Sequence, residues 1–204
     1  MKNFNYVISI NSVNSFIVLL LTLMFFSFST VVSAKEFSID RSANFNSNKE
    51  VLKSIIMDYA NYGQLRHHRY YLSGIDEIKI VKQIDENHFY TWTYVNDTKD
   101  YKYFNYVEVS EDASGVIRIK SRLATSNEVS SLTAETGLPN KSFFDSSDVV
   151  WIIKENLDSR GNLISTTVRY VGAFSASSFG ISLIAPIIRK NLDKTADQMF
   201  TVLK

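Results

Sequence analysis

Cysteine is absent from the 204-residue sequence, and this absence removes several classes of protein. The chain can form no disulfide, and it cannot be a lipoprotein anchored through an N-terminal cysteine. The fold must therefore be stabilised by its hydrophobic core alone. A domain of about 170 residues is large enough to provide such a core.

Proline and glycine are scarce, and neither sign of charge dominates. Two Pro and seven Gly are too few for a disordered or linker-rich chain, and 13% aromatic residues favour a packed domain. The formal net charge is +1. Because phosphate binding normally needs a net basic surface, no nucleic-acid partner is expected. No internal repeat or low-complexity tract is present, which favours a single domain.

The first 34 residues have the pattern of a secretory signal peptide. Lys2 supplies a positive start, residues 16–32 are almost wholly apolar, and Val32-Ser33-Ala34 stands where a signal peptidase would cut. We therefore expect cleavage near Ala34 and a secreted or periplasmic domain over residues 35–204. The alternative is a membrane anchor formed by residues 16–32, because a spanning helix needs about 20 mostly apolar residues.

Hydrophobic periodicity predicts an α+β domain, since strands alternate with period two and helices repeat every three to four residues. The expected strands are 37–45, 75–84, 88–96, 101–110, 115–125, 149–157 and 163–172. Ser47 and Glu50 have the spacing of a capping box, which predicts a helix that begins there and ends or bends at Gly63. A short second helix or loop follows over 64–71, and a long loop is expected over 127–147.

The chain ends with a long amphipathic pattern. From Ile181 to Val202, apolar residues recur at three- and four-residue spacing and form a wide stripe, which predicts a helix lying deep against a sheet. The expected order is one strand, a helix, about six antiparallel strands and a long helix. A sheet curled around such a helix can leave a cavity between the two.

This order and several segments resemble the START-like (SRPBCC) superfamily, also called the polyketide-cyclase and birch-pollen-allergen-like helix-grip fold, and in particular its coenzyme-Q-binding-like branch. The segment 56–62 looks like the end of the family's first helix, where an apolar pair precedes Asp, an aromatic residue and a turn. Residues 151–153 with Gly161 and 166–170 are similar to its last two strands, and 185–188 fits before the terminal amphipathic run.

The resemblance implies a fold and a class of ligand. The implied fold is a curved antiparallel sheet of about six to seven strands around a long C-terminal helix, with one or two short helices after the first strand. Proteins of this superfamily typically bind lipids, sterols, quinones or other isoprenoid and polyphenolic ligands, and a minority are cyclases, hydrolases or dioxygenase subunits. Many relatives carry Pro soon after the aromatic residue, where this chain has Gly63-Gln64-Leu65, so its cavity mouth is expected to differ.

We therefore expect a carrier of a lipid, quinone or isoprenoid-like molecule. The alternatives are a cavity enzyme of cyclase or hydrolase type and a non-catalytic protein-interaction module. The sequence contains no nucleophile elbow, zinc motif, phosphate loop or dinucleotide fingerprint, so no catalytic residue, metal or cofactor is expected.

Alternating aromatic residues on two strands are the expected ligand-binding wall. Tyr90, Trp92 and Tyr94 share one strand face, and so do Trp151 and Ile153. If these faces look toward the terminal helix, they line an apolar chamber in which the Tyr hydroxyls orient the ligand; the alternative is ordinary core packing. The remaining expected lining residues are Val168, Tyr170, Phe174, Phe179, Leu183 and Ile187. The small polar segment 174–180 is expected to be a mobile gate or a plain connector.

Two basic segments complete the expectations. Residues 66–69, Arg-His-His-Arg, are expected to be a solvated loop, with an anionic headgroup contact or a metal site as alternatives. Arg118, Lys120 and Arg122 form a basic row opposite an apolar one, which predicts the solvent side of the sheet. Either segment is an alternative docking surface for acidic lipid, so transient contact with a membrane surface is part of the hypothesis.

Overall fold

The computed structural model describes residues 34–64, 69–96, 100–177 and 181–204. Residues Ala34–Lys204 form one compact unit, and residues 1–33 lie outside the described part of the chain. The signal peptide and its alternative, the anchor, therefore stay predictions. In the described part of the chain, no helix combines the length and the apolarity that crossing a membrane requires.

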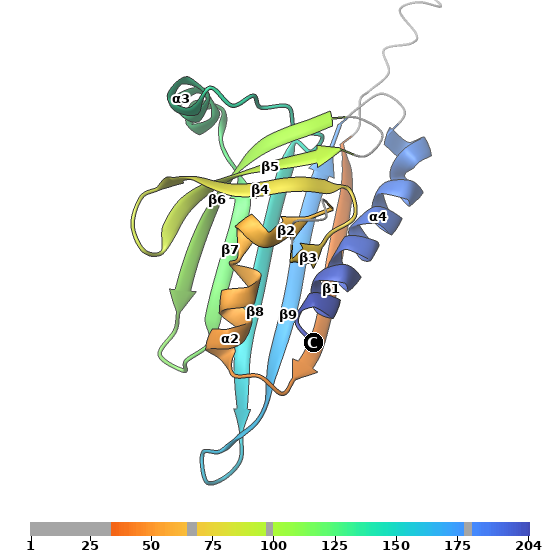
Figure 1. Cartoon of the computed structure of the whole chain (residues 1–204). Helices are drawn as coiled ribbons and strands as arrows, with labels where there is room; N and C mark the ends of the chain where they lie inside the picture. Colours follow the sequence, from red (N-terminus) through yellow and green to blue (C-terminus); the bar gives the residue numbers. More distant parts are fainter. Residues whose placement is uncertain (1–33, 65–68, 97–99, 178–180) are drawn as a thin grey trace, which may run out of the picture. The chain divides into compact units, whose positions relative to one another are not determined.

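A seven-stranded antiparallel sheet, in the order β1-β9-β8-β7-β6-β5-β4, forms the centre of the domain (Figure 1). Its strands are β1 (Lys35–Phe45), β4 (Ile75–Gln83), β5 (His88–Asn96), β6 (Asp100–Glu111), β7 (Ile117–Leu123), β8 (Ser146–Leu157) and β9 (Leu163–Ala176). β1 closes the sheet against β9, with Lys35 opposite Ala176. Two short strands, β2 (Tyr62–Gly63) and β3 (Tyr70–Tyr71), form a separate parallel pair. The predicted α+β class and strand number are confirmed.

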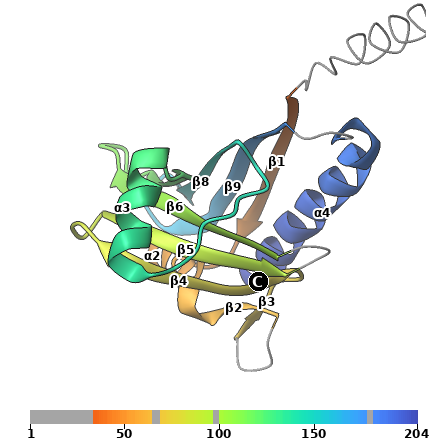
Figure 2. The same cartoon turned by 90° about the horizontal axis from the view of Figure 1, so that it is seen from above.

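The helices cover both faces of this sheet. They are α2 (Lys49–Ile56), the 3-10 turn η1 (Tyr59–Asn61), α3 (Ser126–Thr136) and the long α4 (Ile181–Val202). α2 and α4 pack on one face, which we call the inner face, and α3 packs on the other, the outer face (Figure 2). The expected helix-grip arrangement is present, with an additional helix on the outside.

The start of α2 differs from the capping box expected at Ser47 and Glu50. Asn48 is the N-cap, and its side chain accepts a hydrogen bond from Val51 N over 2.9 Å. The carbonyl of Ser47 instead accepts from Thr166 Oγ1 of β9 over 2.6 Å. The helix also ends at Ile56 rather than Gly63. The first turn of α2 is thus fixed by the last strand of the sheet.

The segment expected to be a long loop contains α3, so that expectation was wrong. Thr125 caps the helix, and the Glu128 carboxylate accepts from the backbone N–H of Thr125 over 2.7 Å, which completes a capping box. Gly137, with φ of 69°, ends the helix in the left-handed conformation that glycine adopts without strain. Only Leu132 is buried, so α3 has almost none of the apolar periodicity that predicts a helix.

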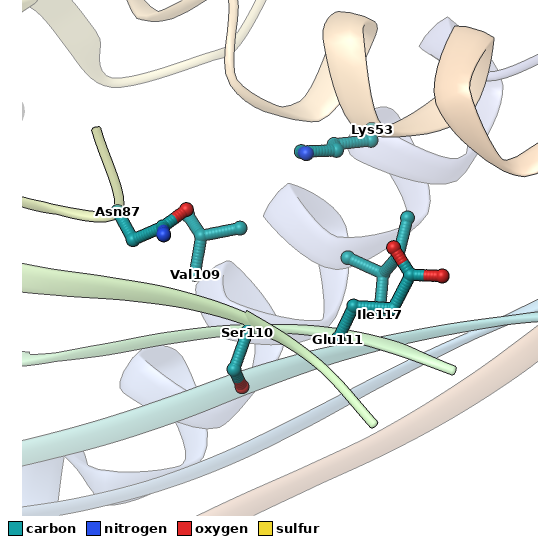
Figure 3. Close-up of a pocket in the computed structure, with 6 residues that line it drawn as sticks. All are labelled: Lys53, Asn87, Val109, Ser110, Glu111 and Ile117. Carbon is teal, nitrogen blue, oxygen red and sulfur yellow. The ribbon is translucent and has the colours of Figure 1, made fainter. Parts of the chain in front are cut away.

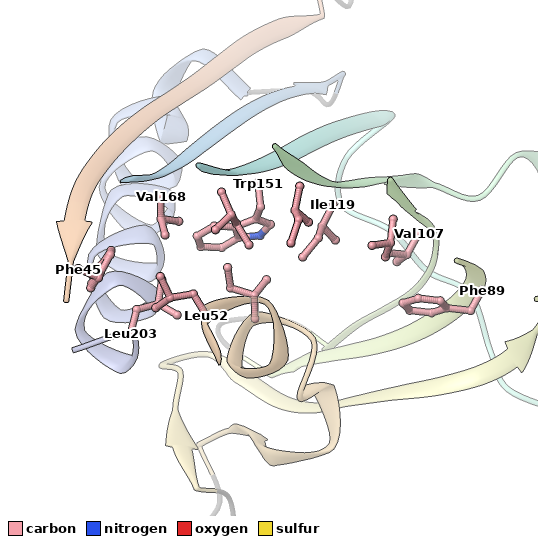
Figure 4. Close-up of a cluster of buried hydrophobic side chains, with 12 residues drawn as sticks. Phe45, Leu52, Phe89, Val107, Ile119, Trp151, Val168 and Leu203 are labelled. Carbon is pink, nitrogen blue, oxygen red and sulfur yellow. The ribbon is translucent and has the colours of Figure 1, made fainter. Parts of the chain in front are cut away.

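The largest core lies on the inner face, between the sheet and α2 (Figure 4). Its buried members are Phe45, Leu52, Ile56, Phe89, Val107, Val109, Ile117, Ile119, Trp151, Ile153, Val168 and Leu203. A second cluster, nearer the β1 edge, consists of Phe37, Ile39, Phe174, Ala176, Ile181 and Ala196. α2 therefore covers the middle of the inner face, and α4 covers mainly the side formed by β1 and β9.

Candidate functional site on the inner face of the sheet

Several of the expected lining residues do lie together on the inner face. Trp151 stands opposite Tyr170 in the β8–β9 ladder, and their ring centroids are 4.6 Å apart. Ile153 and Val168 form the next inner pair and are fully buried. Phe174 continues the row, with its ring 5.2 Å from that of Phe144. These residues form one apolar wall along β8 and β9.

Tyr90, Trp92 and Tyr94 lie on the outer face instead. Trp92 is buried beside Phe104 and Leu132, beneath α3. Its indole Nε1 donates to the carbonyl of Pro139 over 3.0 Å. The placement of this aromatic row under the C-terminal helix was therefore wrong. The row is core packing for α3, the helix that the hydrophobic pattern does not predict.

The hydroxyls of the outer-face tyrosines are also already bonded. Tyr90 Oη donates to Glu128 over 2.8 Å, and Tyr94 Oη donates to Asp100 over 3.3 Å. Burial, together with the neighbouring Glu128, raises the pKa of Tyr90 to about 12. Neither hydroxyl is left to orient a ligand on the inner face.

The expected lining residues of the last helix are not in the wall either. Leu183 is 85% exposed and Ile187 is 59% exposed, because the packed stripe of α4 passes through Ala185, Ile188 and Leu192. Phe179 lies outside the described residues. In the segment expected to be a gate, residues 174–176 belong to β9, and 178–180 lie outside the described residues.

Three tyrosines supply polar groups to the inner side: Tyr170, which the sequence interpretation selected as a lining residue, and Tyr59 and Tyr103, which it did not. Tyr59 lies in the η1 turn and contacts Phe89, with ring centroids 5.9 Å apart. Tyr103 lies on β6 and Tyr170 lies on β9. Burial raises the pKa of Tyr103 to about 12 and also raises the pKa of Tyr59 and of Tyr170. None of the three hydroxyls forms a hydrogen bond with a residue that the structure describes.

These hydroxyls are exceptions to a strong rule, because buried polar groups in proteins nearly always have a hydrogen-bond partner. The indole Nε1 of Trp151 also lacks a hydrogen-bond acceptor within the described ranges. Part of the surface of each of the three tyrosines is accessible to solvent. Burial is nevertheless the main cause of the raised pKa of each one. The inner side therefore offers several donors to water or to a ligand.

The structure has two hollows, one beside the inner core and one beside the outer-face cluster under α3. The first has a volume of about 170 Å³ and opens between α2 and the β6–β7 strands (Figure 3). Its walls are Lys53, Asn87, Val109, Ser110, Glu111 and Ile117. Val109 and Ile117 belong to the core, whereas the rim is charged, with Lys49 Nζ bonded to Glu111 over 2.5 Å. A cavity of this size accommodates about one small ring.

The second hollow has a volume of about 370 Å³ and lies where α3 begins and β6 and β7 end. Its walls are Phe104, Leu123, Ala124, Ser126, Val129, Ser130, Asn140, Ser142, Phe144 and Asp145. Phe144 connects it to the inner side, since its ring lies 6.5 Å from that of Phe37. This volume is at the lower end of the range for small-molecule sites.

The basic row of β7 lies on the outer face, as predicted. Each cation is paired with an acid: Arg118 with Asp112 at 2.5 Å, Lys120 with Glu108 at 3.5 Å, and Arg122 with Glu128 at 2.8 Å. The row is thus largely neutralised and offers little attraction to acidic lipid. Of the Arg-His-His-Arg segment, only Arg69 is described, and its guanidinium lies 5.2 Å from the centre of the Tyr70 ring.

Comparisons with known proteins bear on the fold. No family model matches the chain, and no curated protein matches its sequence. Among solved structures, a STAR-related lipid transfer protein from Xanthomonas axonopodis aligns with a TM-score of 0.57 at 10% identity, over 81% of this chain and 85% of that one. The human StarD13 lipid transfer and protein localization domain aligns with a TM-score of 0.54 at 8% identity, over 100% and 99%.

A third similar structure is the di-domain ARO/CYC protein StfQ from the steffimycin biosynthetic pathway. It aligns with a TM-score of 0.55 at 6% identity, over 83% of this chain and 49% of that one. These likenesses show that the chain has the START-like helix-grip fold. Because all three identities are low, they do not transfer a ligand or a reaction.

Proposed function

We propose that the domain binds a hydrophobic ligand, such as a lipid, a quinone or an isoprenoid, on the inner face of the sheet. The observation that carries this proposal is the combination of a continuous apolar wall with half-buried tyrosines whose hydroxyls have no partner among the described residues. Removing apolar surface from water contributes about 25 cal/mol per Å². A ligand could therefore be held mainly by burial and oriented by a few hydrogen bonds.

A chain-like ligand needs more room than the two hollows of about 170 and 370 Å³ provide. We infer that α4 supplies this room by moving away from the sheet. In the helix, only Ile181 and Ala196 are buried. Pro186 lies inside its first half and has no N–H, so one backbone hydrogen bond of the helix is missing. The first half of α4 is thus the part that can move at the smallest cost.

The exposed side of α4 supports contact with a membrane surface during uptake or release. Leu183, Ile184 and Ile187 are 85%, 40% and 59% exposed. Arg189 and Lys190 follow directly and make no ion pair with any residue in the described part of the chain. Exposed apolar residues beside unpaired cations are typical of helices that lie on anionic membranes.

We also infer that residues 1–34 are a signal peptide and that the domain acts outside the cytoplasm. The positive start, the apolar run over 16–32 and the small residues near Ala34 support this proposal. N-terminal sequencing of the protein made in its native host tests it. A mature chain that begins at Lys35 is the expected result, and an intact N-terminus in the membrane fraction would establish the anchor instead.

The experiment that tests ligand binding uses residues 35–204. The purified domain is extracted with organic solvent, and the extract is examined by mass spectrometry for a stoichiometric hydrophobic compound. The extracted protein is then titrated with a panel of quinones, sterols and phospholipids. We expect a co-purified ligand and saturable binding of at least one class. A protein that emerges empty and binds no member of the panel would overturn the proposal.

A further inference from the structure

The tyrosines of this domain fall into two groups according to their hydroxyls. Tyr62 donates to the carbonyl of Ile55 over 2.9 Å, and Tyr90 and Tyr94 donate to carboxylates. Tyr103 and Tyr170 belong to the other group, because both side chains are half-buried and neither hydroxyl has a hydrogen-bond partner within the described ranges. A hydroxyl that is shielded from water and lacks a partner is unfavourable, so its position needs an explanation.

The fold brings these two hydroxyls together from distant strands. Tyr103 stands opposite Thr93 on the β5–β6 side of the sheet, and Tyr170 stands opposite Trp151 on the β8–β9 side. β7 and β8 separate β6 from β9 in the sheet. Both side chains nevertheless face the concave inner side, because Tyr103 shares its strand face with the inner core residues Val107 and Val109, and Tyr170 shares its face with Val168. The electrostatic effect of Tyr103 on the pKa of Tyr170 agrees with two phenols that lie near one another.

Gly172 allows the phenol of Tyr170 to adopt its position. It is the next residue of β9 on the same face, and a Cβ atom at this residue would lie 3.6 Å from Tyr170 Oη. The same Cβ would lie 2.8 Å from the ring of Phe174, which is closer than real contacts allow. Both aromatic side chains therefore use the space that the missing side chain leaves free, and Gly172 acts as a positioning residue for the hydroxyl.

The surroundings of this pair suit a neutral partner. Arg41, which faces the same side near α4, is occupied by Asp193 and Asp197. A buried anion would need an available cation or several donors. Burial keeps both phenols protonated well above neutral pH, so they can donate hydrogen bonds but cannot balance a charge.

We infer that Tyr103 and Tyr170 together bind the polar end of the ligand, and that this end is an uncharged hydrogen-bond acceptor such as the carbonyl of a ketone, quinone or ester. The inference rests on the proposed function and adds to it the chemistry of the ligand and the residues that select it. Each hydroxyl donates to a carbonyl oxygen, which has two lone pairs and can accept from both.

The test compares a long-chain methyl ketone with the alkane of equal chain length, on the wild-type domain and on Tyr103→Phe, Tyr170→Phe and the double variant. Tyr71→Phe serves as the matched control, because Tyr71 is 59% exposed. One neutral hydrogen bond contributes about 1 kcal/mol, so each inner variant should bind the ketone about fivefold more weakly. Binding of the alkane should not change, and Tyr71→Phe should behave as wild type.

An infrared measurement adds a readout that a change in packing would not reproduce. The carbonyl stretch of the bound, isotope-labelled ketone should lie at lower frequency in the wild type than in the double variant. Equal affinity of the wild type for ketone and alkane, or equal weakening of both in the variants, would overturn the inference while leaving ligand binding intact. Failure of both probes to bind the wild type would overturn the inference together with the proposed function.

Discussion

Arg41 of the edge strand β1 donates from Nη2 to Asp193 Oδ1 of α4 over 2.6 Å, which joins the first strand to the last helix. Asp197, one turn later, lies 3.5 Å from Arg41 Nε. The side chains of Arg41 and Asp193 are each 40% exposed, and such ion pairs contribute little to the free energy of unfolding. They do hold α4 against the sheet edge, so they bear on opening of the helix.

Arg41→Ala should therefore loosen α4 more than it destabilises the domain. We expect amide hydrogen exchange in the second half of α4 to become up to about fivefold faster, since an exposed ion pair contributes at most about 1 kcal/mol. High salt should reduce the difference from wild type, because it screens the pairs. Arg169→Ala is the control: Arg169 pairs with Asp40 at 2.5 Å, and neither residue contacts α4 through an ion pair in the described structure. Unchanged exchange in Arg41→Ala would contradict this role.

The two tryptophans of the chain report separately on the two faces of the sheet. Trp151 lies in the inner core, and Trp92 lies beneath α3. If the ligand binds on the inner face, Trp92→Phe should keep the change in fluorescence that the ligand causes. Trp151→Phe should lose most of it. The opposite result would place the ligand on the outer face, beside the second hollow, and would refute the proposed location.

Glu128 should make the stability of the domain depend on pH. Hydrogen bonds from Arg122 hold the pKa of this carboxyl far below its ordinary value of 4.5, and its side chain is only 22% exposed. A lowered pKa stabilises the fold above the unfolded-state value, and that stability is lost progressively as the pH falls below it. At pH 7 we expect Glu128→Gln to lose about 2 kcal/mol, the range for charged hydrogen bonds.

Thermal unfolding of Glu128→Gln and wild type across pH 3 to 7 measures this effect. The two unfolding curves should differ most above pH 4.5 and should converge as the pH falls. Glu135→Gln is the matched variant, because Glu135 pairs with Lys82 at 2.5 Å but is 49% exposed, and it should have little effect at any pH. A difference that grows on acidification would have the wrong sign for a lowered pKa.

Leu183→Ser and Ile187→Ser should weaken binding to vesicles that contain anionic phospholipid. Each substitution should lower the partition coefficient of the domain between water and the vesicle surface on the order of tenfold, because one apolar side chain no longer inserts into the lipid headgroup region. Because both residues are exposed, thermal stability should not change. Ile164→Ser provides the comparison, since Ile164 is 63% exposed but lies on β9, away from α4. Co-sedimentation with vesicles measures the effect, and equal loss in all three variants would argue against a specific role for α4.

Strand periodicity was sufficient to predict the sheet, because on strands such as β7 the inner-facing Ile117 and Ile119 alternate with the outward-facing Arg118 and Lys120. α3 could not be predicted from its apolar pattern, since Leu132 is its one buried residue. The local signals for it were present, however: Thr125 and Glu128 have capping-box spacing, and Gly137 follows at the other end. The capping residues at its two ends therefore predict α3 better than its weakly amphipathic pattern does.

The candidate site was predictable only in part. Alternation shows that Trp92 and Tyr94 share a strand face, but it cannot show which face is inner when helices cover both. Tyr103 shares its parity with the core residues Val107 and Val109, so its inward direction was accessible. That its hydroxyl meets no partner among the described residues depends on the side chains that the fold places around it, and these come from segments far apart in the sequence.

The pairing of β1 with β9 has a consequence for synthesis of the protein. Among the described residues, Lys35–Phe45 pair only with residues 166–176, in the last strand of the sheet. Until the ribosome has released that stretch, the first strand has no edge to join, and the antiparallel strands between them can form only an incomplete sheet. Pairing of β1 with β9 is therefore a late step of folding. It joins residues that are remote in the sequence, and such contacts form more slowly than local structure. During synthesis, the domain therefore lacks its native architecture until its last strand has left the ribosome.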